Sequence, residues 1–82
     1  MNMIIEERNT VEYRGEVFDR THGSYFDRGS ADSHYGRPRD PHRGGVGGKS
    51  GPKIKAMFSD SIQAYHAGYD YNEQFGDKKN YE

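Results

Sequence analysis

The sequence predicts a mainly α fold: a two-helix hairpin joined by a flexible basic loop rich in glycine and proline, with a small N-terminal β element. Aromatic and small residues recur at spacings of three and four in residues 25–35 and again in residues 58–69, a pattern typical of one helix face. Each stretch is followed by a glycine, Gly36 or Gly76, a residue favoured at helix C-termini. Residues 36–52 hold all three prolines and a glycine-rich run, which indicates a loop.

The length and composition of the chain limit the size of its core. The chain has 82 residues, of which 30% are hydrophobic, so we expect one small domain of marginal stability. It has no cysteine, which excludes disulfides and thiolate metal sites and favours a reducing compartment or support from a partner, such as a second copy in a homodimer. No apolar run approaches the length of a signal peptide or a membrane span. We therefore expect a cytoplasmic protein with no membrane partner.

The expected elements follow one another along the chain. Residues 2–7 begin an extended segment, and Arg14-Gly15 is a suitable turn for a β-hairpin. Ser24 is a suitable N-cap for a first helix that extends to Tyr35, and Ser59-Asp60 is a suitable start for a second helix. The predicted parts are an N-terminal extended or hairpin segment (1–23), a helical hairpin with a flexible loop (24–76, loop 37–57) and a polar tail (77–82).

The two aromatic stripes also indicate how the helices meet. A chain without tryptophan must bury its other rings, so we expect Tyr65 and Tyr69 to belong to the core. Small side chains beside these rings allow two helices to approach closely. The small residues that we expect at the helix contact are Gly29, Ala31, Ala64 and Gly68.

The formal net charge of −1 hides an uneven distribution of charge. Residues 36–55 carry six lysines and arginines against one acid, Asp40, whereas the parts of the chain on either side are net acidic. Such a basic segment can contact phosphate, or it can pair with the acidic ends of its own chain. Tyrosines beside arginines can also stack on the bases of single-stranded RNA. The predicted nucleic-acid-binding residues are Tyr35, Arg37, Arg39, His42, Arg43, Lys49, Lys53 and Lys55.

The motifs that would indicate catalysis or metal binding are incomplete. Gly48-Lys49-Ser50 resembles the end of a phosphate-binding loop, but the first glycine of that motif would fall at Arg43. The four histidines lack a compact metal-binding spacing. Asp27 and Asp32 point to different helix faces, and Asp27 is better placed for an ion pair with Arg28. We therefore predict no catalytic residues, no metal site and no cofactor.

One pattern is spread over residues 26–72. It consists of Gly29-x-Ala31-x-x-x-x-Gly36-Arg37, Pro41-His42 and Ala64-Tyr65-x-x-Gly68-Tyr69. This pattern resembles the ribosome modulation factor family and its relatives. Short bacteriophage-encoded proteins that carry D-R-G-x-A-D-x-Y-Y-G-R and A-Y-x-x-G-Y are also similar, and most of them have no assigned function.

The resemblance implies a two-helix hairpin that binds ribosomal RNA and protein. Ribosome modulation factors promote the pairing of inactive ribosomes, and one relative in the group is described as a nucleotide-dependent enzyme that modifies a quinolone drug. This chain departs from the family in its near-neutral charge. It also has Asp40 where family members usually carry a cysteine before the proline, and Tyr65 and Tyr69 in place of tryptophans on the second helix.

These observations favour a small non-enzymatic binding protein of bacteriophage origin. Its expected partner is the ribosome or another structured RNA, through which it would act on host translation in the cytoplasm of the host cell. The alternative is a protein-binding factor, either a host-takeover inhibitor or a virion component. A small nucleotide-dependent modifying enzyme is the least favoured function.

Overall fold

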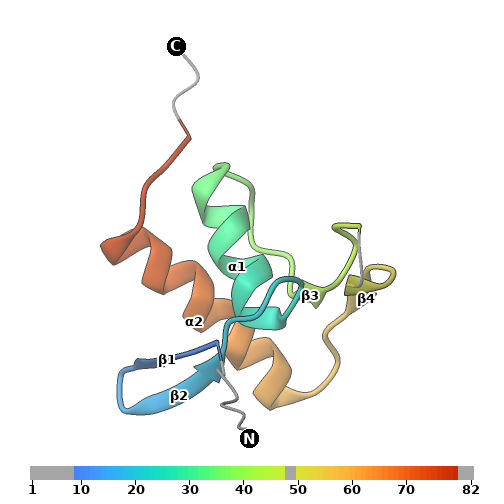
Figure 1. Cartoon of the computed structure of the whole chain (residues 1–82), viewed down its shortest axis with the longest axis horizontal. Coiled ribbons are helices and arrows are strands. Elements are labelled where there is room, and N and C mark those ends of the chain that lie inside the picture. The colour runs from blue at the N-terminus through green and yellow to red at the C-terminus, as the bar shows by residue number, and fades with distance from the viewer. Residues whose placement is uncertain (1–8, 48–49, 80–82) are drawn as a thin grey trace, which may run out of the picture.

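The computed structural model describes residues 9–47 and 50–79, which form two α-helices and two pairs of short antiparallel strands (Figure 1). The extended segment expected at residues 2–7, the predicted contact residue Lys49 and residues 80–82 of the predicted tail lie outside the described residues. The elements are β1 (Thr10–Tyr13), β2 (Glu16–Asp19), α1 (Tyr25–His34), β3 (His42–Arg43), β4 (Ile54–Lys55) and α2 (Ser59–Phe75).

The prediction of a mainly α two-helix hairpin with a flexible loop at residues 37–57 is wrong. That segment contains β3 and β4, which pair antiparallel with His42 opposite Lys55. Backbone hydrogen bonds tie it to the rest of the fold: the Gly44 N–H donates to the Gly23 carbonyl over 2.8 Å, and the Ala56 N–H donates to the Pro41 carbonyl over 3.0 Å. His42 and Ala56 are buried, so this connection packs as a second β element beside the helices.

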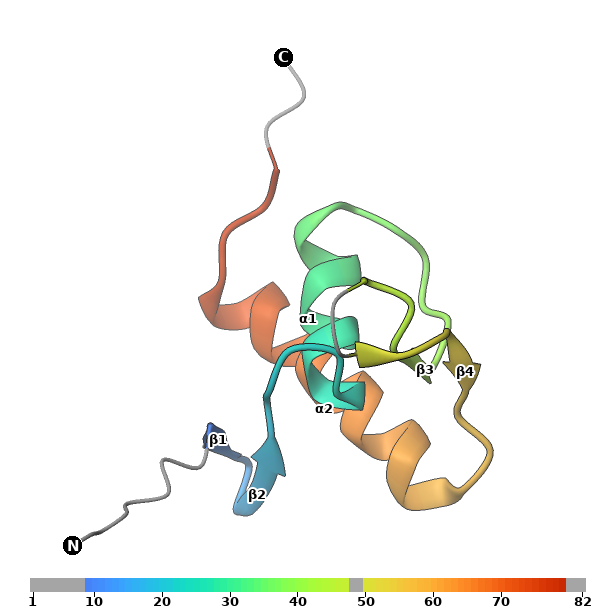
Figure 2. The ribbon, with the colours of Figure 1, turned by 45° about the vertical axis from the view of Figure 1, so that its right-hand side comes forward.

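The predicted N-terminal hairpin is present as β1 and β2. Arg14 and Gly15 both have positive φ angles, 55° and 81°, as a two-residue turn of type I′ requires. The hairpin contributes rings to the core, because Phe18 stacks on Phe26 of α1 with centroids 5.4 Å apart. The two strand pairs lie on opposite sides of the helix pair (Figures 1 and 2).

Helix α1 has the ends that its sequence predicts. The Ser24 side chain accepts a hydrogen bond from the Asp27 N–H over 3.2 Å, which caps the N-terminus. At the C-terminus the Gly36 N–H donates to the Ser33 carbonyl and the Arg37 N–H donates to the Asp32 carbonyl, at 3.1 and 2.8 Å. These two bonds form a Schellman motif, which needs the φ of 70° that Gly36 adopts.

Helix α2 begins and ends close to its predicted bounds but lacks the expected N-cap. Phe58 occupies the cap position, and no side chain accepts a hydrogen bond there. Beyond the helix, residues 77–79 of the predicted polar tail are exposed but tied to α1, because the Lys79 N–H donates a hydrogen bond to the His34 carbonyl over 2.7 Å. None of the helices in the described part of the chain is both long and apolar enough to cross a membrane.

The two helices touch backbone to backbone at two of the predicted small residues. A Cβ atom added at Gly29 would lie 2.0 Å from the Tyr65 carbonyl oxygen, and one added at Gly68 would lie 2.0 Å from the Phe26 carbonyl oxygen. Only glycine allows this approach at either position. The contact fixes one face of α1 on α2 and leaves another face of α1 directed toward β3 and the segment that precedes it.

Candidate functional site

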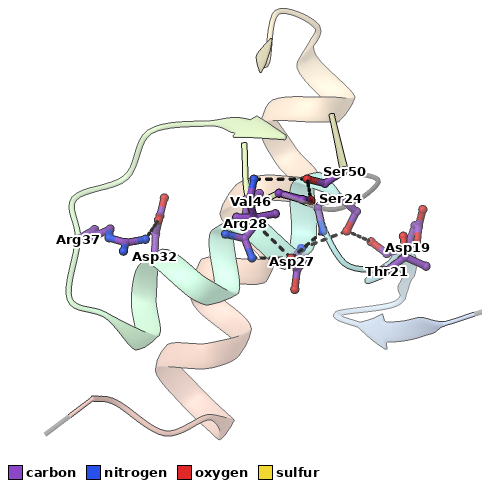
Figure 3. Close-up of polar contacts among 11 residues, drawn as sticks. Asp19, Thr21, Ser24, Asp27, Arg28, Asp32, Arg37, Val46 and Ser50 are labelled. Carbon is purple, nitrogen blue, oxygen red and sulfur yellow. Dashed lines mark hydrogen bonds and ion pairs between the residues drawn. The ribbon is translucent and has the colours of Figure 1, made fainter. Parts of the chain in front are cut away.

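A cavity of about 380 Å³ lies between α1 and the connection that follows it. We call it the Arg28 cavity. Its wall comes from one face of α1, from the chain between α1 and β3, and from the glycine-rich turn after β3. Figure 3 shows polar contacts on this side of α1. The lining residues are Arg28, Asp32, Arg37, Pro38, Asp40, His42, Gly44, Gly45, Val46 and Lys53.

Arg28 is the most deeply buried cation of the cavity, with 8% of the residue exposed. Its Nε and Nη2 atoms donate to one oxygen of Asp27, over 3.1 and 2.7 Å (Figure 3). This is the local ion pair that the sequence predicted. A guanidinium has five N–H donors, so three donors of Arg28 have no acceptor within residues 9–47 and 50–79. The buried end of this side chain is therefore available to an acceptor from outside.

Asp32 lies one helical turn after Arg28 and is held by two donors. The hydroxyl of Tyr65, a fully buried residue, donates to one carboxylate oxygen of Asp32. The Arg37 Nη1 atom donates to the other oxygen over 3.3 Å. Burial, followed by the hydrogen bond to Asp32, raises the pKa of the Tyr65 hydroxyl well above its ordinary value. Tyr65 therefore stays protonated at neutral pH and acts as a donor to the carboxylate.

His42 of β3 places its ring in the cavity wall in a defined tautomer. Its Nδ1 atom lies 2.6 Å from the carbonyl oxygen of Asp40, which can only accept a hydrogen bond. Nδ1 therefore carries a proton, and Nε2 is the acceptor when the ring is neutral. The ring packs against Tyr65 with centroids 5.7 Å apart, and 8% of His42 is exposed.

Asp40 and Lys53 form an exposed ion pair in the cavity wall, with 2.9 Å between Lys53 Nζ and the carboxylate. The Lys53 hydrogen bond is the main cause of a lowered pKa at Asp40, and the charges of Lys53, His42 and Lys55 act in the same direction. The backbone N–H of Asp40 donates to the Tyr65 hydroxyl over 3.0 Å. The cavity wall is thus connected to the core through Tyr65.

The structure divides the predicted contact residues into three groups. Arg37, His42 and Lys53 line the Arg28 cavity. Arg43 and Lys55 are exposed on β3 and β4 without an ion pair to any described residue. The third group consists of Arg39 and Tyr35, whose side chains make contacts elsewhere on the molecule.

Arg39 and Tyr35 contribute little to the cavity. Arg39 forms an ion pair with Asp70 of α2, lies 3.0 Å from His66 Nδ1, and covers the Tyr69 ring at 4.2 Å from its centroid. Tyr35 is 40% exposed, and the Arg37 guanidinium lies 4.7 Å from the centre of its ring. The basic segment, residues 36–55, therefore pairs in part with the acidic C-terminal part of its own chain, through Arg39 and Asp70. This was one of the two possibilities that the charge pattern left open, the other being contact with phosphate.

Sequence reasoning missed the roles of Arg28, Asp32 and Tyr65 in this site. The available signal was the spacing of four between Arg28 and Asp32, which places both on one helix face. No group of three potential metal ligands gathers among the described residues. The cavity thus combines unused N–H donors of a buried cation with an imidazole acceptor and two carboxylates that already have donors. Comparisons with known proteins add no relative: no family model, curated protein or solved structure matches this chain.

Proposed function

We propose that this chain is a small non-enzymatic binding protein of bacteriophage origin that binds the ribosome or another structured RNA and so acts on host translation in the host cytoplasm. The observation that carries the proposal is the gathering of cations around β3 and β4. Arg43 and Lys55 are exposed there without a carboxylate partner in the described part of the chain, and Lys53 stands in the wall of the Arg28 cavity. Phosphate oxygens are the acceptors that exposed lysine and arginine side chains bind in RNA.

The ion pairs of the other cations are compatible with this function. In the Lys53–Asp40 pair both side chains are more than half exposed. Exposed pairs of this kind are worth about 0–1 kcal/mol, so a phosphate can replace the Asp40 carboxylate at small cost. Arg37 is also more than half exposed, whereas its partner Asp32 is buried. The resemblance to ribosome modulation factors at Gly36-Arg37 and Pro41-His42 favours the ribosome as the RNA-containing target.

The test is binding of purified protein to ribosomes and to a fluorescent single-stranded RNA at increasing salt. If the cations contact phosphates, log affinity should fall with log salt by about 0.7 for each phosphate contacted on a single strand. The double variant Arg43→Gln/Lys55→Gln should bind more weakly and with a shallower slope. The matched control is Lys78→Gln/Lys79→Gln, which removes two cations from the C-terminal segment, away from β3 and β4 (Figure 1).

The control variant should keep the wild-type affinity and slope, and all three proteins should have the same circular dichroism spectrum. Absence of salt-sensitive binding to RNA or ribosomes at micromolar protein would contradict the proposal. Equal losses of RNA affinity in the two double variants would contradict the role of β3 and β4 and would indicate an effect of net charge alone.

One observation favours protein binding as the second candidate function. Ile54, Met57 and Phe58 lie within five residues before α2, and 39%, 77% and 73% of their surfaces are exposed. Exposed apolar side chains in such a group are typical of protein interfaces. A host-takeover inhibitor or a virion component would then retain its partner after nuclease treatment and at high salt. Met57→Ser/Phe58→Ser would abolish that retention, whereas the Arg43→Gln/Lys55→Gln variant would keep it.

A further inference from the structure

Arg28 is buried, whereas the cations of the proposed RNA surface, Arg43, Lys53 and Lys55, are exposed. Buried polar groups nearly always have hydrogen-bond partners, since an unpaired donor away from water is costly. The guanidinium uses its Nε side toward Asp27, which leaves the two Nη1 donors and one Nη2 donor without an acceptor among the described residues. These three donors belong to a side chain that lines the Arg28 cavity. The cavity is therefore equipped to receive an acceptor.

The carboxylates of the cavity do not supply that acceptor. Asp32 accepts hydrogen bonds from Tyr65 and Arg37, and Asp40 accepts one from Lys53. A guanidinium edge with parallel N–H groups matches two oxygens of a phosphate or a carboxylate. Lys53 in the same wall adds a second cation.

The remaining polar groups of the cavity suit a ligand that also carries hydroxyl groups. His42 has Nε2 as an acceptor in its neutral form, because Nδ1 donates to the Asp40 carbonyl. Asp40 has a half-exposed carboxylate with lone pairs beyond the one that accepts from Lys53. A ribose hydroxyl can donate to either group. The volume of about 380 Å³ falls in the range of roughly 300–1,000 Å³ that is typical of small-molecule sites.

We propose that the Arg28 cavity binds the terminal phosphate of an RNA strand together with its ribose. A terminal phosphate is a monoester with three free oxygens and a charge of about −1.5 to −2 at neutral pH. An internal phosphate has two free oxygens, one negative charge and chain on both sides, so it fits a buried guanidinium less well. The proposal rests on the proposed function for RNA as the source of the phosphate, and a free mononucleotide presents the same chemistry.

The primary test uses the wild-type protein and needs no variant. Three RNAs of the same sequence, about ten nucleotides long, carry a 5′-phosphate, a 3′-phosphate or hydroxyl groups at both ends. We expect one of the phosphorylated strands to bind at least roughly tenfold more tightly than the hydroxyl strand. Equal affinity for all three strands would overturn the inference and leave the proposed function intact.

Variants then locate the preference within the structure. Arg28→Gln should abolish the tighter binding of the phosphorylated strand. Arg28→Lys should keep only part of this difference in affinity, because lysine keeps the charge but lacks the planar pair of donors. The matched control is Arg43→Gln, which makes the same charge change at an exposed position outside the cavity. This control should weaken the binding of all three strands by the same factor. Loss of the preference in Arg43→Gln, with retention in Arg28→Gln, would overturn the assignment.

A second measurement on wild-type protein covers the case in which Arg28→Gln does not fold. Amide chemical shifts of Gly44, Gly45 and Val46 should change more with the preferred phosphorylated strand than with the hydroxyl strand, because these residues line the cavity. Differences confined to β1 and β2 would overturn the proposal. Adenosine monophosphate serves as a competitor: if it binds in an Arg28-dependent manner while no RNA binds, both RNA as the source and the proposed function fail.

Discussion

The two faces of α1 differ in what fills the space beside them. On the face toward α2, Gly29 and Gly68 bring backbones into contact, and no side chain lies between them. On the face toward β3, Arg28 and Asp32 border an open cavity that is also lined by Asp40, His42 and Lys53. One helix thus provides a tightly packed scaffold on one side and a site on the other. Close packing on one face of a helix can therefore hold a buried cation such as Arg28 on another face without using its free N–H donors.

The largest effect is expected at the packed face. Gly68→Ala would place a Cβ atom 2.0 Å from the Phe26 carbonyl oxygen, which is too close for two non-bonded atoms. Neither backbone can move away without separating the helices. We expect the free energy of unfolding to fall by about 3 kcal/mol or more, although alanine is the better helix former by about 1 kcal/mol. Urea denaturation measures the change. Ser30→Ala, a substitution on a partly exposed position of α1, should change stability by less than about 0.5 kcal/mol.

A wild-type melting temperature in Gly68→Ala would contradict the backbone contact between the helices. It would also remove the distinction between the two faces of α1, because the face toward α2 would then have room for an added methyl group, as the face toward the cavity has.

The next effect is expected where the core supports the cavity. Tyr65→Phe removes the hydroxyl that donates to Asp32 and accepts from the Asp40 N–H. Loss of a partner at a buried polar group costs about 1–3 kcal/mol. Tyr69→Phe is the matched control, because its hydroxyl donates to the exposed Arg37 carbonyl and should cost less. Equal losses of stability in the two variants would show that Asp32 does not depend on Tyr65.

The same hydroxyl predicts a dependence of stability on alkaline pH. Burial and the bond to Asp32 raise the pKa of Tyr65, so the folded chain keeps this proton at a pH where an unfolded tyrosine, with a pKa of about 10, loses it. Above about pH 10 the unfolded state therefore binds fewer protons, and the free energy of unfolding falls as pH rises. Denaturation between about pH 8 and about pH 11 should show a steeper fall for wild type than for Tyr65→Phe. Parallel curves would contradict the raised pKa.

The smallest effects on stability are expected at the exposed ion pairs. Lys53→Gln and Arg39→Gln should each lower the free energy of unfolding by no more than about 1 kcal/mol. Their effects on RNA binding should differ, because Lys53 stands in the cavity wall and Arg39 is bound to α2. We expect Lys53→Gln to reduce the slope of log affinity against log salt concentration by about 0.7, and Arg39→Gln to leave this slope unchanged. The reverse result would move the binding surface from the cavity to α2.

Local signals in the sequence determined the elements that depend on neighbouring residues. Ser24 and Gly36 cap α1 because capping needs one side-chain oxygen at the start and one residue with positive φ at the end. Arg14-Gly15 determined the first hairpin in the same way. The close contact at Gly29 and Gly68 was also predictable, because small residues at helical spacing are visible in the sequence.

The conformation of residues 37–57 and the set of residues that line the Arg28 cavity depend on the tertiary structure and cannot be read from local sequence. Glycine and proline in that segment indicate flexibility when read locally, but buried His42 and Ala56 and the bond from Gly44 to Gly23 depend on parts of the chain far away in sequence. Arg28 has the same sequence signature as any surface arginine beside an aspartate. It is buried because the returning connection covers it, and a covering segment is a property of the whole fold rather than of the residues next to Arg28.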